Sequence, residues 1–114
     1  MSNVGLKFDD DKLRYDLVPW KEFEEVVKVI TEGAKRYSEY NWQKVEPKKR
    51  YWAAAMRHMI AWALGKRINR EDFGCSHLSH AVVSLLFLMW KDNNEEVANE
   101  APKNNEDRSA DLSS

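Results

Sequence analysis

The fold is decided by the uncharged stretch HLSHAVVSLLFLMW, residues 77–90. A helix that spans a bilayer needs roughly 20 apolar residues, so this shorter run predicts a buried helix of a globular protein over residues 77–92. On a helix its residues form two opposite faces. One holds Leu78, Val82, Leu85, Leu86 and Met89, and the other holds His77, His80, Ser84 and Leu88. A helix with two such faces needs partners on both sides.

Two more helices precede this stretch. Pro19 opens a helix over about residues 19–39, with one apolar stripe that includes Phe23, Val26, Val27, Ile30, Ala34 and Tyr37. Pro47 and Gly65 bracket a second helix over about residues 48–64, which again has two apolar faces. Three helices cannot cover two that are apolar nearly all round. We therefore expect an all-α helical bundle completed by oligomerisation, as a homo-oligomer that is a dimer or higher.

The length of the chain and the distribution of its charges predict how it is divided into segments. The 114 residues fit one domain with a net charge of −1. We expect an N-terminal arm over 1–18, a helical domain over 19–92 and a disordered acidic tail over 93–114, since the tail has few large apolar residues. The remainder is mildly positive but has no concentrated basic stripe, which favours an anionic small molecule over duplex nucleic acid.

The location of the protein follows from absences in the sequence. There is no secretory signal at the N-terminus, no membrane segment, and a single cysteine, Cys75. We therefore expect a cytoplasmic protein with no membrane partner. Cys75 is expected to be a buried small residue rather than a nucleophile.

All three histidines fall on the second faces of two helices. His77 and His80 share a face because they are three residues apart, and His58 joins them if the two helices are neighbours. Neutral imidazole binds metals and acts as a general base near neutral pH. The alternative is that each histidine only satisfies a hydrogen bond in the interior. Glu71 and Asp72 are the acids best placed to complete a metal site with His77 and His80, although they can equally be loop charges; Glu22 and Glu25 are weaker candidates, and Glu25 is expected to point outward.

A second candidate cluster is basic and aromatic. Lys7, Lys12, Arg14, Lys35 and Arg36 are donors that can hold a polyphosphate, or they are solvated surface charges. Tyr37, Tyr40 and Trp42 offer a stacking surface for a base, or they cover a small core.

Several short segments, in a fixed order, resemble the phage dATP/dGTP diphosphohydrolase family, which is MazG-like. They are Lys7-Phe8-Asp9, Asp11-Lys12, Arg14, Leu17-Val18-Pro19, Gly33-Ala34-Lys35-Arg36-Tyr37, Asn41-Trp42, Arg57-His58, Gly65 and His77-Leu78-Ser79-His80-Ala81. The resemblance implies an all-α, oligomeric enzyme that uses Mg²⁺ or Mn²⁺ and cleaves a purine (deoxy)nucleoside triphosphate to the monophosphate and pyrophosphate. It adds Asn41 and Arg57 to the nucleotide-binding candidates.

One segment departs from that family's pattern. Where the resemblance implies Gly-Glu-x-x-Asp after the second helix, this chain has Gly65-Lys66-Arg67-Ile68-Asn69. Lysine cannot coordinate a metal, whereas Lys66 can contact phosphate. Either Glu71 and Asp72 take over the metal, or the chain is a catalytically degenerate relative that sequesters a nucleotide or cyclic-nucleotide signal, as an anti-defence sponge. A structural oligomer with no ligand is the third alternative.

Overall fold

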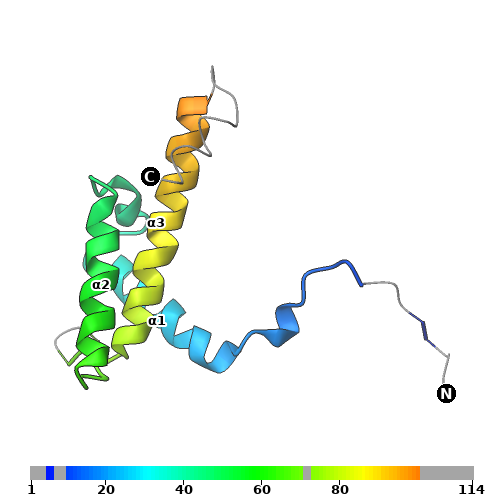
Figure 1. Ribbon diagram of the computed structural model, residues 1–114, viewed down its shortest axis with the longest axis horizontal. Coiled ribbons are helices and arrows are strands. Elements are labelled where there is room, and N and C mark those ends of the chain that lie inside the picture. Colours follow the sequence, from blue (N-terminus) through cyan, green and yellow to red (C-terminus); the bar gives the residue numbers. More distant parts are fainter. Residues whose placement is uncertain (1–4, 7–9, 71–72, 101–114) are drawn as a thin grey trace.

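Three α-helices make up the body of the chain in a computed structural model that describes residues 5–6, 10–70 and 73–100, with side chains described to residue 95. They are α1 (Trp20–Arg36), α2 (Lys49–Ala63) and α3 (His77–Glu100), with two short 3-10 helices, η1 (Tyr15–Leu17) and η2 (Asn41–Lys44). The long α3 packs against both α1 and α2, as Figure 1 shows. The described residues contain no strand beyond an isolated bridge between Ile68 and Ser76. The prediction of an all-α fold is confirmed.

A search of the described helices finds none with the length and apolar character to cross a membrane.

The helix ends follow local sequence signals. α2 ends at Ala63, and Gly65 then adopts a φ of 93°, a left-handed conformation that suits glycine after a helix. The hydroxyl of Ser76 accepts a hydrogen bond from the Leu78 amide at 3.0 Å, which caps α3 as expected. The predicted bounds of α2 are within a residue of those observed.

Two predicted bounds need correction. α1 ends at Arg36 rather than at residue 39, because the chain turns sharply at Ser38. α3 continues past the predicted end at Asp92 to Glu100. The boundary predicted at residue 93 for the tail over 93–114 therefore lies inside this helix. The polar residues 93–100 extend an already formed helix, which needs no new nucleation. The rest of the predicted tail lies outside the described residues.

The core lies where α1 meets α3. Val26 and Val29 of α1 are buried with Val83 of α3 and with Cys75, which is only 3% exposed. The prediction of a buried, small apolar role for Cys75 is therefore confirmed. The predicted membership of the apolar stripe on α1 is wrong in part. Val27 is 48% exposed, whereas Val29, which was not predicted to belong to the stripe, is buried.

The segment between α1 and α2 is fastened to α3. The indole of Trp42 lies flat on the ring of Phe87, with centroids 4.3 Å apart, and meets Trp90 edge-on. The ammonium group of Lys91 donates to the Gln43 carbonyl at 3.0 Å and to the Glu46 carboxylate at 2.5 Å. This buried lysine fixes the path of residues 43–46.

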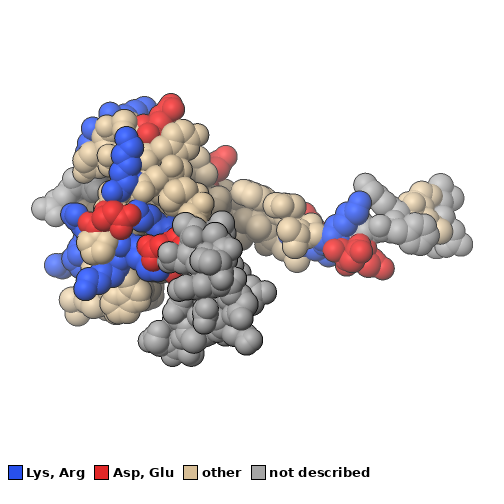
Figure 2. Space-filling view, turned by 90° about the horizontal axis from the view of Figure 1, so that it is seen from above, with Lys and Arg blue, Asp and Glu red and all other residues tan. Residues whose placement is uncertain are grey.

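The N-terminal arm leaves the body. Leu13, Tyr15 and Leu17 are 65–78% exposed, and the arm extends away from the three helices in Figures 1 and 2. One local contact fixes where it joins α1: the Trp20 indole N–H donates to the Tyr15 carbonyl at 2.8 Å.

Candidate functional site

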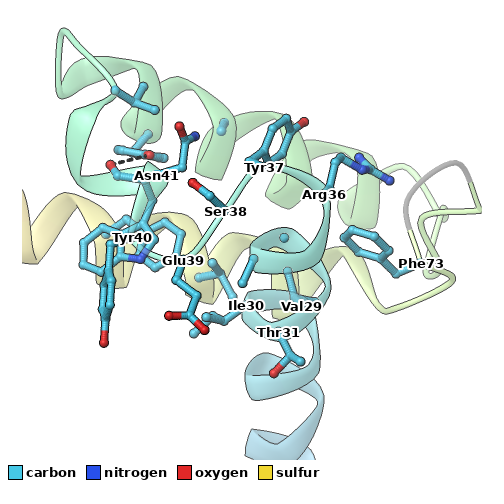
Figure 3. A pocket seen from close by; sticks show the side chains of 18 of the residues that line it. Val29, Ile30, Thr31, Arg36, Tyr37, Ser38, Glu39, Tyr40, Asn41 and Phe73 are labelled. Carbon is cyan, nitrogen blue, oxygen red and sulfur yellow. Dashed lines mark hydrogen bonds between the residues drawn. The ribbon is translucent and has the colours of Figure 1, made fainter.

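A pocket of about 830 Å³ opens between the end of α1, the following segment and α2. Its floor comes from Val83 and Phe87 of α3, and Figure 3 shows side chains from α1 and from residues 37–41 around it. Small-molecule sites typically measure about 300–1,000 Å³. The pocket is therefore large enough for a nucleotide.

Three arginines line this pocket against one acid. Arg36 ends α1, while Arg50 and Arg57 lie on α2, and Glu39 is the single carboxylate among the lining residues. Arg50 and Arg57 are seven residues apart, which places them on the same side of the helix two turns apart. Since guanidinium groups bind phosphate through paired donors, the lining charge favours an anionic ligand.

The Arg36 guanidinium rests on an aromatic ring. Its central carbon lies 4.6 Å from the centroid of Phe73 and 5.9 Å from that of Tyr37. Such cation–π contacts help to hold an arginine in place. Figure 3 shows Arg36 extending from the end of α1 toward Phe73.

Strained backbone conformations are concentrated around the pocket. Among the described residues, the non-glycine positions with positive φ are Ser38 at 150°, Tyr40 at 64° and Phe73 at 65°, and all three line the pocket. L-residues in such conformations cost about 1–3 kcal/mol each and cluster at functional sites. The backbone conformations that shape this pocket therefore lower the local stability of the chain.

The aromatic residues divide between wall and rim. Trp42 belongs to the wall, because Phe87 covers one face of its indole and the Tyr51 hydroxyl donates to its carbonyl at 2.8 Å. Burial raises the pKa of Tyr51, which keeps this hydroxyl a donor. Tyr37 and Tyr40 line the pocket yet remain 65% and 63% exposed. They are the residues best placed to stack on a base.

The three histidines meet, as the sequence predicts. The Nδ1 atoms of His58 and His77 lie 2.9 Å apart, and the rings of His58 and His80 stack with centroids 4.8 Å apart. A hydrogen bond between two such nitrogens requires one to donate and the other to accept. The tautomers of His58 and His77 therefore decide which ring donates this hydrogen bond.

One aromatic ring joins this cluster to the pocket. Phe73 lines the pocket and carries Arg36 on its ring, and it also lies nearly parallel to the His80 ring, with centroids 6.2 Å apart. None of the histidines lines the pocket itself. The histidine cluster thus lies directly behind the pocket wall.

Glu25 differs from the prediction that it points outward. Its carboxylate accepts a hydrogen bond from the backbone N–H of Ser76 at 3.0 Å, and the residue is half-buried. The positive N-terminal end of α3 stabilises a carboxylate at this position. Glu25 therefore links α1 to the start of the helix that carries His77 and His80.

The metal site stays a prediction. Within the part of the chain that the structure describes, no group of three or more histidine, cysteine or acidic residues is arranged to hold a metal ion. Glu71 and Asp72, the predicted ligands besides His77 and His80, lie outside the described residues. The donors described here do not by themselves fit a Mg²⁺ site, which prefers oxygen ligands.

The structure does not bring the described members of the predicted basic cluster together. Among these described members Arg36 alone lines the pocket, while Lys35 is exposed and paired with Glu32 at 3.1 Å. Lys12 and Arg14 lie on the exposed arm, and Lys7 lies outside the described residues. Asp16 binds Arg14 at 2.8 Å, which raises the pKa of Arg14 and lowers that of Asp16. Lys12 and Arg14 are separated from Lys35 and Arg36 because the arm leaves the body at the start of α1, whereas Lys35 and Arg36 lie at its end.

Of the remaining residues predicted to contact a nucleotide, most line the pocket and one does not. Tyr37, Asn41, Trp42 and Arg57 line the pocket, whereas the exposed Lys66 does not. Lys66 sits in the turn after α2, where its amide donates to the Ala61 carbonyl at 2.9 Å.

Arg50 and Phe73 line the pocket and were not among the residues predicted from the sequence. Arg50, Ala54 and Arg57 follow the spacing of one helix face, with a small residue between two arginines, and that pattern signals an open basic face. Phe73 carried no comparable signal, because its role depends on a left-handed backbone that the sequence does not announce.

Comparison with known proteins identifies a family and a relative of this chain. Residues 2–101 match the family described as dATP/dGTP diphosphohydrolase, N-terminal. A dATP/dGTP diphosphohydrolase of Salmonella phage PMBT28 is 33% identical over 100 residues, which cover 85% of this chain and 33% of that protein. The chain thus spans about a third of the length of this relative. No solved structure matches. The match over residues 2–101 shows that the chain belongs to the dATP/dGTP diphosphohydrolase family, to the part that the family description calls N-terminal.

Proposed function

We propose that this chain binds a purine (deoxy)nucleoside triphosphate in the arginine-lined pocket and hydrolyses it to the monophosphate and pyrophosphate. The observation that carries the proposal is the pocket itself, which is lined by Arg36, Arg50 and Arg57 and by the exposed rings of Tyr37 and Tyr40. The family to which the chain belongs gives the class of ligand and reaction.

The proposed binding mode follows from the positions of the side chains. The guanidinium groups neutralise the phosphates, whose repulsion otherwise opposes both binding and attack by water. Tyr37 and Tyr40 at the rim stack on the base. The Asn41 side chain, which also lines the pocket, has an amide that can donate to and accept from a purine edge.

The histidine cluster is proposed to supply the proton acceptor. Its support is that His58, His77 and His80 lie together next to Phe73, which lines the pocket, and that imidazole is a general base near neutral pH. Glu71 and Asp72 remain the proposed ligands of Mg²⁺ or Mn²⁺.

The first test is turnover by the purified full chain. It is incubated with dATP, dGTP, ATP or GTP, with Mg²⁺ or Mn²⁺, and pyrophosphate is measured. Release of equal amounts of monophosphate and pyrophosphate is the expected result. Nucleotide binding without pyrophosphate under either metal would overturn the hydrolysis proposal and leave a nucleotide-binding protein.

The second test addresses the pocket by calorimetry or thermal shift. Arg57→Ala and Arg50→Ala are each expected to weaken triphosphate binding about tenfold, because a hydrogen bond to a charged group contributes about 1.5–3 kcal/mol. The matched control is Lys28→Ala, which removes an exposed cation from α1 outside the pocket. Equal affinity in all three variants would place the ligand elsewhere.

A further inference from the structure

Gly33 is the one glycine of this chain that the backbone conformation does not explain. The chain has four glycines, and Gly5, Gly65 and Gly74 have φ values of 74°, 93° and 68°, in a left-handed region that suits glycine. Gly33 instead lies inside α1, where a glycine makes the helix less stable than an alanine would. Its presence there needs another explanation.

Packing within the chain does not require a glycine at this position either. Among the described residues, a Cβ built on Gly33 meets no atom within 4 Å beyond its chain neighbours and the backbone of its own helix. The space beside it belongs to the pocket, because Gly33 is one of the lining residues. The missing side chain therefore leaves the last turn of α1 open to a ligand.

The surroundings of Gly33 suit the base of a nucleotide. Val29 and Ile30 precede it by four and three residues and Tyr37 follows it by four, so they lie on its side of α1, and all three line the pocket. Figure 3 shows these side chains around the end of the helix. A flat aromatic base can approach a helix backbone more closely at glycine than at any other residue, because no Cβ intervenes. Apolar side chains and an exposed aromatic ring favour such a base at this wall.

The phosphates have better partners on α2. Carbonyl groups at the C-terminal end of a helix carry partial negative charge, which disfavours a phosphate beside Gly33 in the last turn of α1. Arg50 and Arg57 line the pocket from α2, and guanidinium groups bind phosphate through paired donors. Arg36 extends away from Gly33 toward Phe73, as Figure 3 shows. The pocket thus separates a wall for a base from a wall for phosphates.

We propose that the purine base of the bound nucleotide lies against the backbone of α1 at Gly33, beside the ring of Tyr37, with its phosphates directed to Arg50 and Arg57. This orientation rests on the proposed function and adds to it the residue that makes room for the base. A side chain at position 33 would occupy the space of the base while leaving the two arginines in place.

The test fills this space in the full chain. Gly33→Ala and Gly33→Leu are titrated by calorimetry, with Mg²⁺, against the α,β-imido analogues of dATP and dGTP, in which the bond to be cleaved is replaced. Affinity is expected to fall about tenfold in Gly33→Ala and further in Gly33→Leu, because contacts to the face of a base contribute strongly to binding. Lys28→Leu, at an exposed position of α1 outside the pocket, is the matched control and is expected to bind as wild type does.

Inorganic tripolyphosphate separates the two parts of the ligand. Its affinity is expected to be equal in wild type and Gly33→Leu, because Arg50 and Arg57 are retained. Tripolyphosphate binding that is absent from wild type, or that is lost in Gly33→Leu together with binding of the analogues, would overturn the assignment of the two walls.

Thermal unfolding measures whether position 33 is open. Gly33→Ala is expected to raise the Tm by about 2–6 °C, because alanine restricts the unfolded chain and displaces no neighbour in the folded one. A lower Tm would contradict the reasoning, because the added methyl group would then meet other parts of the chain.

The inference and the proposed function fail in different ways. Analogues that bind wild type and Gly33→Leu equally would overturn the placement of the base and leave the proposed function intact. Analogues that bind neither protein would overturn the proposed function, and the orientation of the ligand with it.

Discussion

The buried lysine of α3 makes the sharpest prediction about how the pocket keeps its shape. The Lys91 side chain is 4% exposed, whereas its partner Glu46 is 65% exposed. In Lys91→Met the ion pair and the bond to the Gln43 carbonyl are both lost, while an apolar chain of similar length fills the space.

The magnitude follows from three opposing contributions. A hydrogen bond from a charged group contributes about 1.5–3 kcal/mol, and the pair with the exposed Glu46 adds no more than about 1 kcal/mol because Glu46 is solvated again when released. Removing the desolvation cost of the buried ammonium offsets part of this loss. We expect a net destabilisation of about 1–2 kcal/mol, which corresponds to a Tm lower by about 5–10 °C for a domain of this size.

The assay is urea unfolding followed by tryptophan fluorescence at a fixed protein concentration. Trp42 and Trp90 lie together beside the clamped segment and report its release. Lys28→Met, at an exposed position of α1, is the matched control and is expected to change stability by less than about 0.5 kcal/mol. A Lys91→Met variant as stable as wild type would refute the reasoning, because the clamp would then contribute nothing beyond its own desolvation.

Three further predictions address other contacts. Tyr51→Phe removes the hydrogen bond to the Trp42 carbonyl and is expected to cost about 1 kcal/mol in urea unfolding; no loss would show that water replaces the hydroxyl. Phe73→Leu removes the aromatic face under Arg36 and is expected to weaken nucleotide binding about threefold by calorimetry; an unchanged Kd would contradict it. Hydrogen bonds to Asp92 and then Glu95 raise the pKa of Lys48 from 10.5 to about 12. The stabilisation from Lys48, about 1 kcal/mol after solvent screening, is therefore complete below pH 10.5 and lost as the pH rises toward 12. The stability difference between wild type and Lys48→Met should shrink over that range, and a constant difference would contradict the assignment.

The helices could be predicted because their signals are local. Pro19, Pro47, Gly65 and Ser76 mark ends through backbone geometry and capping, which operate within a few residues. The end of α3 was missed because a polar sequence can continue a helix that a packed stretch has already nucleated.

The histidine cluster could be predicted from the sequence, whereas the positions of the basic residues could not. His58, His77 and His80 were brought together by helix geometry plus one assumption, that the second and third helices are neighbours. The positions of Lys12 and Arg14 relative to the pocket could not be predicted, because the arm has no helical or strand periodicity that fixes its direction in space.

The three left-handed residues around the pocket have a consequence for how this surface can evolve or be engineered. Replacing Ser38, Tyr40 or Phe73 with glycine would relax the local backbone, yet each change also removes a side chain from the binding wall. Under the proposed function, selection for stability and selection for ligand binding therefore act in opposite directions at these three positions. Thermostabilised variants that carry glycine there should be screened for lost binding before they are used.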